Sequence, residues 1–146
     1  RFLDGSAISL QPQTQFRVEQ FRFSGQGGRA ADEDRVVMRF IKGALRAVSG
    51  LIGREKREQY RMDTVVGTIG IRGTEYGATL GGGGLAVSIY AGVVEVCNNA
   101  GCAQGGPGQT LLVPDAGTRP QLQPGGAPPT AAPATPTAPE LPPVQP

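Results

Sequence analysis

The run of residues 64–76, TVVGTIGIRGTEY, is the sequence feature that most constrains the fold of this chain. It mixes β-branched residues with three glycines, and glycine suits a narrow turn or a close backbone approach better than a helix. Val66, Ile69 and Ile71 supply apolar side chains at strand-like intervals. The run therefore predicts a strand, a tight corner at residues 72–75 and a second strand.

Further short apolar runs predict strands over most of residues 1–119. Many are separated by glycine-bearing turns at roughly 8 to 12 residue intervals. Such spacing is typical of a sandwich, a barrel or a short β-solenoid, and no exact sequence period indicates a strict repeat. We therefore expect an all-β fold, β-solenoid-like or a sandwich. The expected strands cover residues 15–23, 36–41, 44–48, 59–62, 68–71, 75–80, 86–90, 93–97 and 110–113.

Residues 15–23, QFRVEQFRF, place their apolar side chains on one face only if the strand is irregular. A bulge at Glu19 and Gln20 restores the alternation and leaves Arg17 and Arg22 pointing the other way. The apolar face then holds Phe16, Val18, Phe21 and Phe23.

Residues 32–52 have a second interpretation, because their apolar residues also fit helical spacing. Gly43 and Gly50 weaken a helix, so strands are preferred there.

Residues 120–146 form a compositionally distinct tail. They hold ten of the thirteen prolines and one charge, Glu140. Such a segment cannot bury enough apolar surface to fold, and as polyproline II at about 3.1 Å per residue it extends on the order of 80 Å. We expect a disordered spacer or terminus, with a ligand for a proline-binding groove as the less favoured alternative.

The two cysteines indicate a cellular compartment. Cys97 and Cys102 enclose Asn-Asn-Ala-Gly, a composition that favours a tight reversal and brings the two residues within disulfide range. Zinc binding is disfavoured because the chain has no histidine and no second cysteine pair, and four intervening residues disfavour a redox motif. A structural disulfide, rather than free thiols, implies the periplasm or another exported location.

Catalysis is not indicated by the residue types present. The absence of histidine removes the commonest general base and metal ligand. Asp32, Glu33 and Asp34 are interpreted as a solvated acidic turn, and Glu75 with Arg72 as an ion pair that fixes the corner. We expect a protein that is not an enzyme and binds no cofactor or metal.

Positive charge is concentrated in residues 35–61, which hold eight basic residues against two glutamates in a chain of net charge +2. The candidate anion contacts are Arg54, Lys56, Arg57 and Arg61. Only Tyr60 stands among these charges to stack on a base, so nucleic acid is the least favoured partner. A solvated loop is the simplest interpretation, followed by contact with lipopolysaccharide, cell-wall polymer or an acidic protein surface.

No apolar run approaches the ~20 residues that a membrane-spanning helix needs. Arg1 stands where an initiator methionine would, so we expect any targeting segment to be missing from this chain.

Five ordered blocks of the sequence resemble the FecR-like domain family. The family signature is an aromatic strand, a threonine, a small-residue stretch and an (I/V)RGTE(F/Y) corner. The matching blocks are YRMDTVVGTIGIRGTEY at 60–76, LDGSAISLQPQTQFRV at 3–18, FIKGALRAVSG at 40–50, VSIYAGVVEVC at 87–97 and GQTLLVPDAG at 108–117. Two departures stand out. Val65 follows Thr64 where the family has proline, and the chain begins three positions before Asp4, so we expect a preceding strand pair to be missing.

The resemblance implies a domain of the bacterial cell envelope that binds a partner or transmits a signal. Family members typically lie in the periplasm, receive a signal from an outer-membrane transporter and pass it through a membrane helix to an extracytoplasmic-function sigma factor. A stand-alone exported member is the better match here. We expect recognition of an unidentified envelope protein through an exposed sheet edge, with the corner residues Arg72, Gly73, Thr74 and Glu75 as contacts.

Two other functions remain open on the sequence. One is a structural envelope protein that associates with itself through its sheet edges. The other is a binder of anionic polymers that uses the basic segment 35–61.

Overall fold

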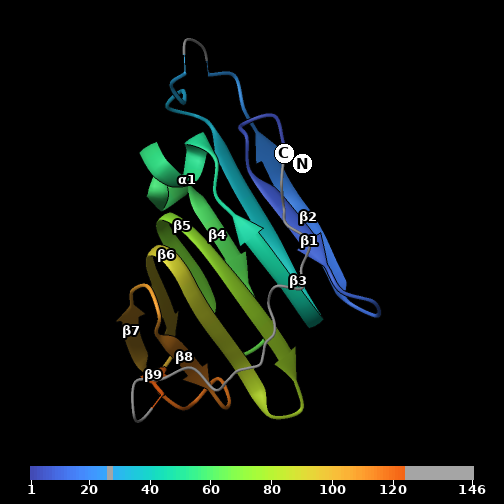
Figure 1. The fold of residues 1–146 in the computed structure, drawn as a ribbon, viewed down its shortest axis with the longest axis vertical. Coiled ribbons are helices and arrows are strands. Elements are labelled where there is room, and N and C mark those ends of the chain that lie inside the picture. Colours follow the sequence, from blue (N-terminus) through green and yellow to red (C-terminus); the bar gives the residue numbers. More distant parts are fainter. Residues whose placement is uncertain (26–27, 124–146) are drawn as a thin grey trace.

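The all-β prediction is confirmed by the computed structural model, which describes residues 1–25 and 28–123. In these residues nine strands belong to one sheet, accompanied by the short helix α1 (Leu51–Glu55) and the 3-10 turn η1 (Arg57–Gln59) (Figure 1). The strands are β1 (Ala7–Leu10), β2 (Gln15–Arg22), β3 (Arg35–Val48), β4 (Tyr60–Asp63), β5 (Thr68–Gly81), β6 (Gly84–Asn98), β7 (Gly101–Gly105), β8 (Thr110–Val113) and β9 (Gln121–Leu122).

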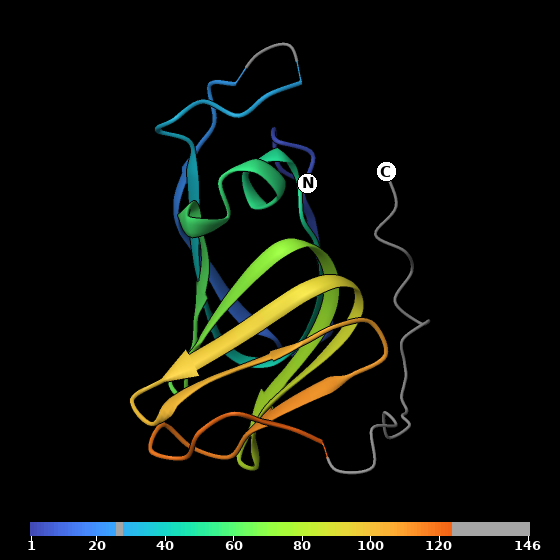
Figure 2. The same ribbon diagram turned by 90° about the vertical axis from the view of Figure 1, so that its left-hand side faces the viewer.

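Three of these strands are long and bend sharply, as Figure 2 shows for β5 in green and β6 in yellow. Each contains a glycine in the left-handed region: Gly43 in β3 (φ 109°), Gly73 in β5 (φ 52°) and Gly92 in β6 (φ 78°). Residues with a Cβ atom rarely adopt this conformation. Two short strands were predicted on either side of each glycine. In the structure they are the two halves of one bent strand, β3, β5 or β6.

The bends divide the backbone pairing into two layers of a single sheet. The first layer contains β2, residues 35–42 of β3, β4, residues 68–72 of β5, residues 93–98 of β6, and β7. The second layer contains β1, residues 43–48 of β3, residues 75–81 of β5, residues 84–91 of β6, β8 and β9. Because β3, β4 and β5 all pair with one another, the sheet curls into a half-barrel whose layers face each other (Figure 2).

The core lies between the two layers and consists of inward-facing residues from both. Tyr60 and Tyr76 meet there through a hydrogen bond of 2.6 Å between their hydroxyl groups. Burial raises the pKa of both phenols, so both stay protonated over the ordinary pH range. Complete burial of an apolar side chain contributes about 1.5–3 kcal/mol. The most deeply buried apolar side chains include Met38, Phe40, Ile52, Met62, Ile69, Leu85, Val87, Ile89, Val94, Val96 and Leu111.

Helix α1 packs at one end of the curled sheet and is held there by Asp4. The Asp4 carboxylate accepts hydrogen bonds from the Ser6 backbone and hydroxyl (3.0 and 2.7 Å) and from the Ile52 backbone (3.3 Å). The Asp4 carbonyl accepts a further bond from the Leu51 N–H. The Asp-Gly-Ser block thus anchors the segment that follows β3. None of the described helices is long and apolar enough to cross a membrane.

The structure adds features to the sequence prediction. Residues 53–58, where no element was expected, include the end of α1 and the start of η1, and β7 lies between the strands expected at 93–97 and 110–113. Strand β9 pairs with β8 inside the segment that was assigned to the tail. The rest of the expected tail, residues 124–146, lies outside the described residues.

Candidate functional site

The corner at residues 72–75 is a bulge inside a continuous strand. Between Arg72 and Glu75, β5 advances by three residues while β6 advances by two, from Val93 to Ala91. In the next step, from Glu75 to Tyr76, β5 advances by one residue while β6 advances by two, from Ala91 to Ile89, so the offset between the strands is cancelled. Strand β5 therefore shifts its alternation, so that Thr74 faces inward.

Thr74 is part of the fold and not of the surface. Its backbone N–H donates to the Ser49 hydroxyl (2.9 Å), and the Ser49 N–H donates to the Thr74 carbonyl (2.9 Å). Only 3% of Thr74 is exposed. Of the four predicted corner contacts, Arg72 is exposed, Gly73 and Glu75 are half-buried, and Thr74 is enclosed.

Glu75 pairs with Arg46 of the neighbouring strand β3, and not with Arg72 as the sequence suggested. The Arg46 Nε donates to Glu75 Oε2 at 2.9 Å, and the guanidinium lies 4.7 Å from the centre of the Tyr90 ring. Arg46 stands opposite Gly77 in the sheet, and the Tyr90 hydroxyl lies over that glycine. The bulge separates Arg72 from Glu75, whereas β3 brings Arg46 directly to the carboxylate.

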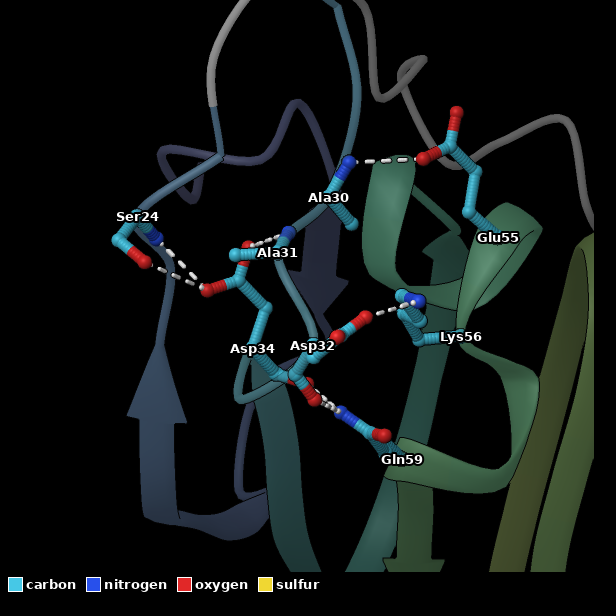
Figure 3. A network of polar contacts seen from close by, with 8 residues as sticks. All are labelled: Ser24, Ala30, Ala31, Asp32, Asp34, Glu55, Lys56 and Gln59. Atoms are coloured by element: carbon cyan, nitrogen blue, oxygen red, sulfur yellow. Dashed lines mark hydrogen bonds and ion pairs between the residues drawn. The ribbon is translucent and has the colours of Figure 1, made fainter.

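The predicted acidic turn at residues 32–34 is only partly solvated. Asp32 is exposed, but Asp34 is buried, and its carboxylate accepts hydrogen bonds of 2.7 Å from the backbone of Ser24 and of Ala31 (Figure 3). Burial raises the pKa of Asp34, but the backbone hydrogen bonds from Ala31 and Ser24 outweigh it and the pKa is lowered. Asp34 therefore closes the loop before β3.

The same loop is tied to the helical segment that carries several of the predicted anion contacts. Lys56 donates to Asp32 at 2.9 Å, Gln59 donates to the Asp32 carbonyl at 3.0 Å, and Glu55 accepts from the Ala30 N–H at 2.7 Å (Figure 3). The hydrogen bond with Lys56 lowers the pKa of Asp32, and the pKa of Lys56 is raised. Lys56 is thus engaged within the protein.

Two of the four predicted anion contacts are engaged in ion pairs within the protein. Arg61 is paired with Asp63 at 3.0 Å, and Lys56 is paired as described. Arg54 and Arg57 are exposed. Sequence proximity alone did not show which charges share a face.

Five arginines of β2, β3 and β4 instead share the outer face of this part of the first layer, which we call the arginine face. Arg17 stands opposite Arg39, and Arg22 stands opposite Arg35. The only carboxylates among the neighbouring outward positions of these strands are Glu19 and Asp63. Two of the arginines come from β2, outside the basic segment 35–61; the alternation of residues 15–23 was the signal for them. The arginine face consists of Arg17, Arg22, Arg35, Arg39 and Arg61.

Glu19 lies among these arginines. It accepts a hydrogen bond from Arg17 at 2.8 Å, and the Arg39 Nε is 3.6 Å away. The hydrogen bond from Arg17 is the main cause of the lowered pKa of Glu19, and Arg39 and Arg61 lower it further by charge attraction. The side chain of Glu19 therefore stays ionised, but its single negative charge does not neutralise the five arginines of the arginine face.

Strand β2 forms an edge of the sheet. Among the described residues it pairs with β3 alone, and its register shifts between Val18 and Gln20, which confirms the predicted bulge. The core thins toward this edge: Phe40 of β3 is fully buried, its partner Phe16 is half-buried, and Val18 is 42% exposed.

The two cysteines face each other in the hairpin of β6 and β7. Cys97 and Cys102 occupy directly opposite positions, with an S–S distance of 2.09 Å and a Cα–Cα distance of 4.0 Å. Glu95 lies nearby, but bonded sulfurs offer no thiolate to a metal ion.

Comparison with known proteins gives the chain its family. A model of the family described as FecR protein matches residues 1–95. No curated protein matches the chain.

The fold is similar to two crystal structures of a putative anti-sigma factor from Parabacteroides distasonis. Their TM-scores are 0.60 and 0.59, and the sequence identities are 16% and 17%. Each match covers 84% of this chain and 52% of the other, so the chain spans about half the length of those proteins. At this identity the likeness concerns the fold. Because the family model matches more than half of the sequence, the chain belongs to the FecR family.

Proposed function

We propose that the protein is a non-enzymatic recognition module of the bacterial cell envelope, which takes part in signal transmission by binding another protein. Membership of the FecR family is the observation that carries this proposal. The similarity of fold to anti-sigma factors supports a signalling role.

An exported location, periplasmic in a bacterium with two membranes, is part of the same proposal. The Cys97–Cys102 pair supports it, because disulfides persist in oxidising compartments and are rare in the cytosol.

Deletion of the gene in its native host, followed by measurement of transcript levels, tests the signalling role. We expect changes in a coherent set of genes that share one sigma factor, and restoration on re-expression of the chain. Unchanged transcripts in every envelope condition tested, with and without the gene, would contradict the proposal.

Binding of an anionic polymer is a second candidate, favoured by the arginine face rather than by residues 54–57. Guanidinium groups bind phosphate and carboxylate groups in bidentate fashion. Self-association through the β2 edge is less favoured, because antiparallel pairing of two copies of β2 with Arg17 opposite Arg22 brings arginines together.

A further inference from the structure

The open edge of β2 offers backbone hydrogen bonds to another strand. Within residues 1–25 and 28–123, only the β3 side of β2 is paired. Its eight residues extend about 26 Å at 3.3 Å per residue, and the unpaired N–H and C=O groups along the other side form a template for strand addition.

The inner side of this edge is apolar and incompletely covered. Val18 stands opposite Met38, and Phe21 stands opposite Val36. The β3 residues are almost completely buried, whereas Val18 is 42% exposed. The Phe2 ring already lies 5.1 Å from the Phe21 ring, so an additional strand with apolar residues at its inward positions would chiefly cover Val18.

The outer side of the edge holds unfavourable charge pairs. Arg17 opposite Arg39 and Arg22 opposite Arg35 are like charges at directly opposed positions, which destabilise a sheet. Arg17 keeps 60% of its side chain exposed in spite of its bond to Glu19. The acidic residues near Arg22, Asp32 and Glu33, line a shallow groove with it, and Asp32 is already bound by Lys56.

We propose that β2 accepts an extended strand of another protein, in which acidic residues alternate with apolar ones. This inference rests on the proposed recognition function and specifies its partner. Carboxylates on the outer side of the added strand would face Arg17 and Arg22, and apolar residues on its inner side would pack against Val18 and Phe21.

The register of β3 defines the spacing of that strand. Arg17 and Arg22 stand opposite Arg39 and Arg35, which are four positions apart because β2 has a bulge between them. A strand that mirrors β3 on the open side has acidic residues at its first and fifth positions. Its second and fourth positions are apolar, and the third, beside Gln20, is neutral.

The same charges disfavour a second copy of this chain as the occupant. Antiparallel pairing of two β2 strands in the register that sets Arg17 of one copy opposite Arg22 of the other would place like charges together at both positions. Like charges and a bulge are the features by which edge strands avoid self-pairing. A strand with carboxylates at these positions is instead attracted by Arg17 and Arg22.

The test uses a fluorescent ten-residue peptide with the central sequence Glu-Val-Thr-Val-Glu, titrated with the full chain and followed by fluorescence anisotropy. The matched peptide has the central sequence Val-Glu-Thr-Glu-Val, which keeps the composition and charge but moves the carboxylates to the inner side. We expect the first peptide to bind at least tenfold more tightly, because only it satisfies both sides of β2.

The matched protein variants are Arg17→Glu/Arg22→Glu on the edge and Arg54→Glu/Arg57→Glu outside the arginine face. The edge variant should weaken binding of the first peptide about tenfold, and the second variant should change it less than twofold. Both variants are at exposed sites, and unchanged thermal unfolding of each shows that the fold is intact.

Equal binding of the two peptides, or equal loss in the two variants, would overturn the proposal. Binding of a heparin-like polysaccharide through Arg17 and Arg22, without binding of either peptide, would overturn it in favour of an anionic polymer. Concentration-dependent dimerisation that the edge variant abolishes would overturn it in favour of a second copy. Peptide binding and the transcript response to gene deletion are separate readouts, so either can fail alone.

Discussion

The substitution Gly92→Ala tests how the sheet turns from one layer to the other. Gly92 lies in the left-handed region at the bend of β6, beside the bulge of β5. A Cβ atom there would overlap the Gly73 carbonyl oxygen and lie 2.7 Å from Thr74 Cγ2 and 2.8 Å from the Arg72 carbonyl oxygen. The substitution therefore acts on both bent strands together.

Two costs add at this position. A residue with a Cβ in the left-handed conformation costs roughly 1–2 kcal/mol. Overpacking against a backbone that must shift typically costs about 1–3 kcal/mol. We expect Gly92→Ala to lower the free energy of unfolding by about 2–5 kcal/mol, a large part of the roughly 5–15 kcal/mol of an ordinary domain.

Gly82→Ala is the matched control, because it makes the same chemical change in the turn between β5 and β6. No heavy atom lies within 4 Å of a Cβ built at Gly82, and its backbone is not left-handed. Its effect should remain within about 1 kcal/mol.

Urea unfolding, followed by circular dichroism and by tyrosine fluorescence, measures the difference. The chain has no tryptophan, so the fluorescence reports on its three tyrosines, which include the buried Tyr60–Tyr76 pair. With an ordinary urea slope, the midpoint of Gly92→Ala should fall by on the order of 1–2 M relative to Gly82→Ala. Equal midpoints would refute the argument that the sheet requires glycine at this bend.

Three other substitutions test the contacts around the sheet. Cys97→Ser/Cys102→Ser should lower the free energy of unfolding by about 2 kcal/mol, measured in urea without reductant, and an unchanged midpoint would show that the bond does not stabilise the fold. The folded-state pKa of Asp34 is lowered, so its contribution is complete above the unfolded pKa of about 3.9 and is lost as the pH falls through the folded pKa. Asp34→Asn should therefore flatten the fall in melting temperature below about pH 4, and an unaltered acid profile would contradict this assignment. Glu75→Gln should cost no more than about 1 kcal/mol and reduce the salt dependence of unfolding, because its bond to Arg46 is partly exposed; a salt dependence equal to that of the parent chain would exclude a contribution from the pair.

The sequence contained the signals for strands because they are local. Alternating apolar residues and the glycines near each bend were sufficient to predict most strand segments and the bulge in β2. Local signals did not show that the backbone pairing continues through Gly43, Gly73 and Gly92. In sequence, such a glycine resembles a turn between two short strands.

The contacts that the sequence missed depend on neighbours far along the chain. Arg46 reaches Glu75 because β3 and β5 pair, and Asp34 is buried because Ser24 and Ala31 enclose it. Helix α1 was missed because it has only five residues, one of them Gly53.

The arginine face could not be identified from the run of basic residues at 35–61. It forms because β2 and β3 pair, which places Arg17 beside Arg39 and Arg22 beside Arg35, 22 and 13 positions later in the chain. Alternation in residues 15–23 predicted the direction of these two side chains, but only the register showed that they oppose Arg39 and Arg35.

Amide hydrogen exchange of β2 tests most directly whether this edge is a recognition surface. In the free protein, N–H groups on the open side of residues 15–22 should exchange quickly, while those paired with β3 exchange slowly. Saturation with the Glu-Val-Thr-Val-Glu peptide should slow the open-side groups in the parent chain and leave them fast in Arg17→Glu/Arg22→Glu. Exchange on that side that stays fast when the peptide is bound, or is already slow without it, would contradict the account.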